Sequence, residues 1–108
     1  MFKHRLSKLV FLLFFVTAFS QAAPHVDASS ILAKSRNCMA CHQVHGIVLG
    51  PSFSDVALKY ARKKDVSTYL ALRILKGGTG TWGQIPMPAN PQLSEAEAQQ
   101  LAIWILAQ

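Results

Sequence analysis

The stretch Cys38-Met39-Ala40-Cys41-His42 decides how this chain folds. Two cysteines three positions apart, followed at once by a histidine, form the spacing typical of covalent haem attachment. Each thiol can form a thioether with one vinyl group of the porphyrin, which holds the adjacent imidazole where it can ligate the iron. The motif therefore predicts one covalent haem c, with Cys38 and Cys41 as its attachment points and His42 as an axial iron ligand.

Other uses of a C-x-x-C pair have to be weighed against haem, because zinc sites and redox-active cysteine pairs share the spacing. A structural zinc site takes about four ligands, usually from two such clusters. This chain has only two cysteines, and both belong to the motif. The remaining alternative is a reduced or disulfide-linked pair beside a surface histidine.

Residues 1–22 are predicted to be a secretory signal peptide. Three basic residues begin the chain, an apolar run follows over 9–19, and small residues precede a cleavage point after Ala22. The alternative is an uncleaved membrane anchor. The run is shorter than the roughly 20 residues that span a bilayer, which favours a cleaved signal peptide. We expect export to the periplasm, no integral membrane span after cleavage, and one small domain over residues 23–108.

The charge of the chain changes once the signal is removed. The whole chain has 11 Lys and Arg against 5 Asp and Glu. The first 22 residues contain three of the basic residues and no acid, which leaves eight against five, or +3. No basic stripe interleaved with aromatic residues is present, so the sequence does not predict nucleic-acid binding.

Apolar residues at helical spacing predict an all-α fold of four to five short helices around the haem. Cap residues define the expected helix starts, because their side chains satisfy the free N–H groups of a first turn. We expect helices over 28–37, 55–62 and 66–76 and a last one reaching the C-terminus, opened in turn by Asp27, Ser54, Asp65 and a Ser94–Glu97 capping box.

The Gly- and Pro-rich stretch 79–91 is predicted to be irregular and to carry the second iron ligand. The first methionine leaves with the signal, and Met39 lies inside the attachment turn, where it cannot reach the far face of the haem. Met87 remains, between two prolines that stiffen the backbone. The alternatives are His25 on the N-terminal arm as the ligand, or Met87 as a flexible core residue.

Several stretches beyond the motif resemble the small bacterial class I cytochromes c, in particular the short monohaem carriers of denitrifying and respiring proteobacteria. They are Gly50-Pro51, the run from Trp82 to Asn90 that includes Ile85-Pro86-Met87-Pro88, and the closing Leu101-Ala102-Ile103-Trp104. The resemblance covers residues 31–108 and implies about four helices wrapped around one haem. Ala33 stands where such proteins often have an aromatic residue, which puts the packing of the terminal helices in doubt.

The same resemblance implies supporting roles around the haem. The carbonyl of Pro51 would accept a hydrogen bond from the second ring nitrogen of His42. Arg73 and Trp82 would reach a haem propionate, and Asn90 would form a hydrogen bond near Met87.

These features together predict a periplasmic electron carrier, not an enzyme, with His/Met-ligated iron. It would pass single electrons between respiratory partners such as a nitrite reductase, a terminal oxidase or a peroxidase. Contacts would be transient, through apolar residues 47–49 and basic residues 62–64, and the protein would be a monomer. The alternatives are a haem enzyme or gas-binding protein with a labile sixth ligand, or a detached subunit of a respiratory complex.

Overall fold

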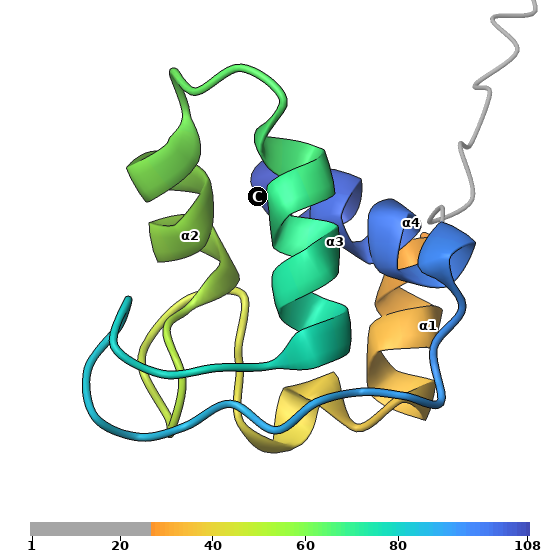
Figure 1. Cartoon of the computed structure of the whole chain (residues 1–108), viewed down its shortest axis with the longest axis horizontal. Helices are drawn as coiled ribbons and strands as arrows, with labels where there is room; N and C mark the ends of the chain where they lie inside the picture. The colour runs from red at the N-terminus through yellow and green to blue at the C-terminus, as the bar shows by residue number, and fades with distance from the viewer. Residues whose placement is uncertain (1–26) are drawn as a thin grey trace, which may run out of the picture.

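The computed structural model describes residues 27–108, and the regular structure in this part of the chain is helical (Figure 1). The predicted signal peptide, residues 1–22, and the alternative ligand His25 lie outside the described residues. Within 27–108, no helix is both long enough and apolar enough to cross a membrane. The elements, in chain order, are α1 (Ala28–Ser35), the 3-10 turn η1 (Cys38–Ala40), α2 (Phe53–Tyr60), α3 (Val66–Lys76) and α4 (Glu95–Leu106).

Helix α1 begins at the expected cap and ends earlier than predicted. The side chain of Asp27 accepts a hydrogen bond from the backbone N–H of Ser29 at 3.1 Å. Helical geometry stops at Ser35, and Asn37 adopts a left-handed conformation with φ of +61°. Asparagine tolerates this conformation better than most residues. The left-handed residue turns the chain directly into η1, which places the haem-attachment motif.

Ser54 does not cap the second helix, so that prediction is wrong. The cap is Ser52, whose hydroxyl accepts from the N–H of Asp55 at 3.0 Å and donates to its carboxylate at 2.7 Å. The helix therefore begins two residues earlier than expected. Ser54 lies in its first turn, where its hydroxyl is 3.2 Å from Nδ1 of His45. Both serines fit a cap by sequence, and the fold selects the buried one.

Asp65 stands at the start of α3 without capping it through its side chain. Its φ is +54°, and its carboxylate accepts no capping hydrogen bond. The helix ends at Gly77, whose φ of +65° is the conformation that favours glycine at a helix C-terminus. The capping box of α4 is confirmed, because Ser94 accepts from the N–H of Glu97 and Glu97 accepts from that of Ser94.

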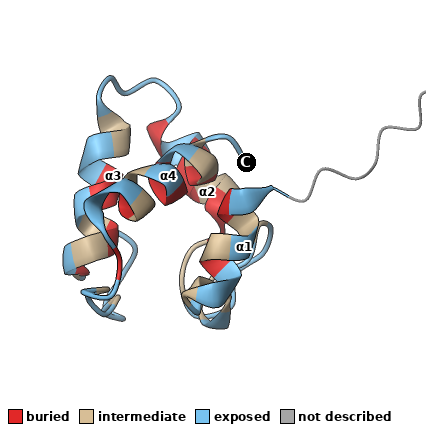
Figure 2. Ribbon diagram, turned by 90° about the vertical axis from the view of Figure 1, so that its right-hand side faces the viewer, coloured by how far each residue is buried: buried red, intermediate tan, exposed pale blue. Residues whose placement is uncertain are grey.

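Helix α4 is the centre of the core, and it packs against the other three α-helices. Its residues Ala98, Leu101 and Ala102 are at most 1% exposed (Figure 2). Ala33 of α1 is equally buried, so a small residue at that position still packs against the core. An ion pair of 2.7 Å between Arg36 and Glu97 also joins α1 to α4. The all-α fold class is therefore confirmed.

Candidate haem site

Two segments extend from the same end of the helical core. The first follows the C-x-x-C-H motif and covers residues 41–52, which we call the His42 arm. The second covers residues 77–90 after α3, which we call the Met87 arm. Both lie at the lower end of the molecule in Figure 1, and Figure 2 separates them, one below α1 and the other below α3. Residues far apart in sequence thus come to one end of the fold.

His42 is held in one orientation by the backbone of its own arm. Its Nδ1 lies 2.7 Å from the carbonyl oxygen of Pro51. A carbonyl only accepts hydrogen bonds, so Nδ1 carries the proton and Nε2 is left as the nitrogen with a free lone pair. A Cβ at Gly50 would collide with the imidazole ring, so this approach requires glycine. This is the second-nitrogen contact that the resemblance implies for Pro51.

Phe53 supports the same imidazole from the first turn of α2. Its ring is stacked on His42 with centroids 5.4 Å apart, and it meets Trp104 of α4 edge-on at 5.2 Å. Sequence analysis did not identify Phe53 as part of the site. Nothing in the spacing along the chain relates it to His42.

The two cysteines lie at the ends of a single tight turn. The backbone N–H groups of Cys41 and His42 both donate to the carbonyl of Cys38, at 3.2 and 3.0 Å. Both cysteines are half-buried and neither is in a disulfide. Burial raises the pKa of the Cys38 thiol, with a smaller opposing effect from a backbone hydrogen bond. Residues 27–108 contain no group of three or more His, Cys, Asp or Glu placed to bind a metal, as a structural zinc site would need.

The Met87 arm is fastened to the end of α3 by its backbone. Gly78 and Met87 form an isolated antiparallel bridge, with N–H to carbonyl distances of 3.0 and 2.8 Å. A Cβ at Gly77 would collide with the carbonyl of Met87, so the arm can approach this closely only because residue 77 is glycine. Met87 is half-buried. Apart from the bridge the stretch is irregular, as its glycines and prolines predict.

Asn90 fastens the far end of the Met87 arm. Its side-chain amide donates to the carbonyl of Ile74 at 2.9 Å and more weakly to that of Pro88 at 3.4 Å. Its backbone N–H donates to the carbonyl of Leu75 at 2.9 Å. Three hydrogen bonds from one residue therefore hold the chain immediately after Met87.

Arg73 lies on α3 and Trp82 on the Met87 arm, and the two side chains are not joined to each other. The guanidinium of Arg73 lies against the backbone of Gly78, where a Cβ would collide with it. The ring of Trp82 is 44% exposed and lies 4.9 Å from the Nζ of Lys59. No hydrogen bond connects the two side chains within the described part of the chain. The contact with Lys59 was not expected from the sequence.

The residues present fit a covalent haem. Two thiols, an oriented imidazole and a thioether supply the attachment and ligand chemistry that such a group needs. Both arms also expose large apolar side chains, which an apolar macrocycle would cover in part. They are Ile47, Val48 and Leu49 on the His42 arm and Trp82 and Ile85 on the Met87 arm, all at least 44% exposed.

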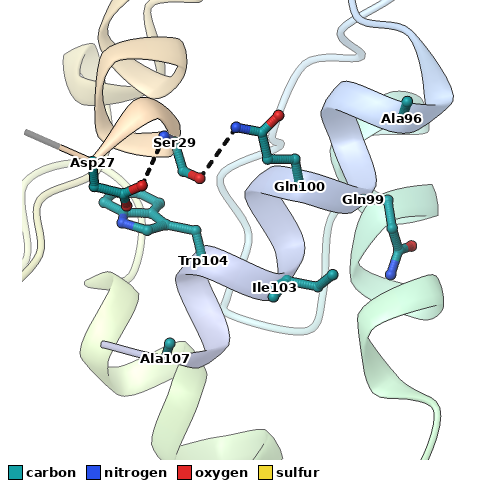
Figure 3. A pocket seen from close by; sticks show the side chains of 8 residues that line it. All are labelled: Asp27, Ser29, Ala96, Gln99, Gln100, Ile103, Trp104 and Ala107. Atoms are coloured by element: carbon teal, nitrogen blue, oxygen red, sulfur yellow. Dashed lines mark hydrogen bonds between the residues drawn. The ribbon is translucent and has the colours of Figure 1, made fainter.

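A separate hollow lies between α1 and α4, away from both arms. Figure 3 shows Asp27, Ser29, Gln100 and Trp104 among the side chains that line it. The Ser29 hydroxyl accepts from the Gln100 amide at 3.3 Å across the two helices. None of the predicted site residues lines this hollow, so it contributes nothing to haem binding.

Comparison with known proteins agrees with this geometry. Residues 26–108 match the family described as Cytochrome c. The chain belongs to the cytochrome c family. A cytochrome c-552 of Nitrosomonas europaea is 54% identical over 84 residues, which cover 78% of this chain and 82% of that protein. A cytochrome c-552 of Hydrogenobacter thermophilus is 51% identical over 80 residues, covering 74% and 81%.

A solved structure leads to the same family. The crystal structure of wild-type Nitrosomonas europaea cytochrome c552 superimposes with a TM-score of 0.69 at 56% identity, covering 71% of this chain and 95% of that one. The predicted resemblance to small class I cytochromes c is therefore confirmed. This cytochrome c carries one covalently bound haem c with its iron, and it is an electron carrier rather than an enzyme.

Proposed function

We propose that this cytochrome c is a periplasmic shuttle for single electrons, with His42 and Met87 as the two axial ligands of its iron. Cys38 and Cys41 would be the thioether attachment points. The bound haem supplies a one-electron ferrous–ferric couple, and a His/Met ligand pair raises its reduction potential. The observation that supports the proposal is that His42, whose imidazole is oriented by Pro51, and Met87, whose backbone is bridged to Gly78, belong to two arms at one end of the fold.

The protein's part in this function is to keep both ligands in place during electron transfer. Pro51 keeps the proton of His42 on Nδ1, so that Nε2 faces the iron as a neutral ligand. The bridge at Gly78 and the amide of Asn90 restrain Met87 from both sides. With His42 and Met87 both held for ligation, neither axial position would be open to a reactant. This arrangement favours electron transfer over oxygen or peroxide chemistry.

The remaining site residues have supporting roles in the proposal. Arg73 and Trp82 would bind the haem propionates, since a guanidinium and an indole N–H both donate to carboxylates. Trp82 lies on the Met87 arm with its side chain partly exposed, and Arg73 lies against the start of that arm at Gly78, which supports this assignment.

Partner binding would use the exposed residues beside the haem. Ile47 is 77% exposed and Val48 and Leu49 about half exposed, so they offer an apolar contact. The exposed cations of 62–64 would attract an acidic redox partner and speed the encounter. Such contacts are small and short-lived. We therefore expect a monomer in solution. In size-exclusion chromatography of a periplasmic extract, the protein should elute at its monomer mass.

The proposed periplasmic location rests on the N-terminal sequence. Residues 1–22 would direct export and be removed, leaving residues 23–108 as the periplasmic protein. N-terminal sequencing of the purified protein tests this directly. A chain that begins at Met1 and fractionates with membranes would contradict it.

The decisive test of the ligand assignment is Met87→Ala, with Met39→Ala as the matched control. We expect Met87→Ala to retain haem, to lose the weak long-wavelength sulfur-to-iron band of the oxidised protein, and to lower the midpoint potential. The drop should be on the order of 100 mV, within the roughly 0.8 V range set by axial ligands. Met39→Ala should keep the band and nearly the same potential. An unchanged potential in Met87→Ala would show that another residue is the ligand.

A further inference from the structure

Lys59 makes an unexpected contact with the arm that carries Met87. We propose that Lys59 is a positioning residue that latches this arm to α2 through Trp82 and so slows dissociation of the Met87 sulfur. This inference rests on the proposed ligation by Met87. It adds a residue outside the arm that controls how firmly the sixth ligand is held.

The contact joins two elements that are otherwise separate. Lys59 lies in the last turn of α2, and its Nζ is 4.9 Å from the ring centroid of Trp82. Side chains from α2 and the start of α3 line one hollow with Thr81 of the Met87 arm. The tip of the arm therefore lies against the α2–α3 junction. Lys59 is the α2 residue whose ammonium group lies over the ring of Trp82.

The tip of the arm has few other restraints. Among the described residues, the hydrogen bonds of 79–86 stay inside this segment, from Thr79 and Gly80 to the carbonyls of Gly83 and Gln84. The bridge to Gly78 and the bonds of Asn90 hold only the two ends of the arm. Trp82 is five positions before Met87, so in this proposal movement of the indole strains the Gly78–Met87 bridge and is passed on to the thioether.

The strength of the contact follows from its exposure. An ammonium over an indole ring is attracted to the negative face of the aromatic system. At an exposed site such a contact shifts an equilibrium by about two- to fivefold. The C-terminal position of Lys59 on α2 also favours a cation there, because the helix dipole is negative at that end.

The chain provides a matched control in Lys63. Its Nζ lies 5.2 Å from the ring centroid of Tyr60, which is only 5% exposed and belongs to α2 itself. Lys63→Gln therefore removes the same charge and the same kind of contact from the same region. Lys63 lines the same hollow as Thr81, but its aromatic contact is with Tyr60 of α2 and not with Trp82 of the Met87 arm.

The experiment uses the oxidised holoprotein and cyanide, which binds ferric iron only after the methionine sulfur has left. We compare the limiting binding rate at saturating cyanide in wild type, Lys59→Gln, Lys59→Arg and Lys63→Gln. A denaturant titration of the long-wavelength sulfur-to-iron band, followed beside helical circular dichroism, provides a second readout. Lys59→Gln should bind cyanide about two- to fivefold faster and lose the band at a lower denaturant concentration. Lys59→Arg and Lys63→Gln should match wild type.

Two results would overturn the latch. Equal acceleration in Lys59→Gln and Lys63→Gln would show a general effect of charge, and an unchanged rate in Lys59→Gln would show that the contact restrains nothing. Failure of the axial assignment gives a different result, because wild type would then lack the band at the outset.

Discussion

The two arms restrain their proposed iron ligands by different kinds of bond. His42 follows directly on the two cysteines that are the proposed covalent links, and its ring is confined by Pro51, Gly50 and Phe53. Met87 depends on a two-bond bridge, on the hydrogen bonds of Asn90 and on a cation over an exposed indole. The first arm is therefore restrained by chemistry and packing, and the second by weak contacts alone.

This difference predicts which of the two proposed ligands dissociates from the iron first. Segments with few buried apolar contacts and exposed backbone hydrogen bonds open at lower free energy than the core. The Met87 arm fits that description, whereas the imidazole of His42 is stacked on a ring that is only 3% exposed. We expect ligand exchange to begin at the sulfur, with the His42 arm and the helices intact.

The largest expected effect comes from removing the covalent links of the His42 arm. Cys38→Ser combined with Cys41→Ser should leave little folded protein, because a domain this small has a thin core and the haem completes it. Haem absorbance per mole of chain and far-ultraviolet circular dichroism measure the loss. Ser54→Ala, near the site but outside the attachment turn, should retain haem and helix. Normal accumulation of a folded, haem-free double variant would remove the contrast between the arms.

A smaller effect is expected from Gly77→Ala on the Met87 arm. Its φ of +65° costs an alanine about 1–2 kcal/mol, and the new Cβ collides with the Met87 carbonyl. The arm must shift, so the sulfur-to-iron band should weaken and the free energy of unfolding should fall by more than the backbone cost alone. Denaturant titrations of the band and of the helices separate these losses.

Gly80→Ala is the control for that experiment. Gly80 also has a positive φ, +96°, but no atom beyond its chain neighbours lies within 4 Å of the new Cβ. It should show the backbone cost and keep the band. Equal losses of the band in both variants would mean that strain anywhere in the arm releases the ligand, and that the close approach at Gly77 has no special role.

The smallest effect is expected at Glu97, which belongs to neither arm and joins α4 to the end of α1 through its ion pair with Arg36. The backbone hydrogen bond at Ser94 and, less strongly, the guanidinium of Arg36 hold the pKa of this carboxyl below its usual value of 4.5. A carboxyl with a lowered pKa stabilises the fold above its usual pKa and loses that contribution as the pH falls through the lowered one. Glu97→Gln should therefore be modestly less stable than wild type at neutral pH, and the gap should close in acid.

Chemical denaturation at neutral pH and well below 4.5 measures this change. Glu95→Gln is the matched control, since Glu95 lies in the same first turn and makes no side-chain hydrogen bond within residues 27–108. A gap for Glu97→Gln that stays constant with pH would mean that the ion pair and the capping box contribute nothing through charge. Neither variant should change the iron–sulfur band.

Local rules were reliable where neighbouring residues make the contact. The capping box of Ser94 and Glu97 and the cap at Asp27 both bond within one turn, and each was predicted from the sequence. They failed where burial chooses between similar candidates. Ser52 and Ser54 are chemically identical, and only the packed structure shows that the 1% exposed one is the cap.

The amino-acid sequence by itself determined the cofactor, and it predicts Cys38 and Cys41 as the points of attachment, because covalent haem chemistry depends on a contiguous motif. It also determined the helical fold class, since apolar spacing is a local property. Only the tertiary structure decided that Phe53 stacks on His42, that Gly77 admits the Met87 carbonyl and that Lys59 lies over Trp82. These contacts join residues 10 to 23 positions apart across loops, so their distances depend on how the helices pack and not on spacing along the chain.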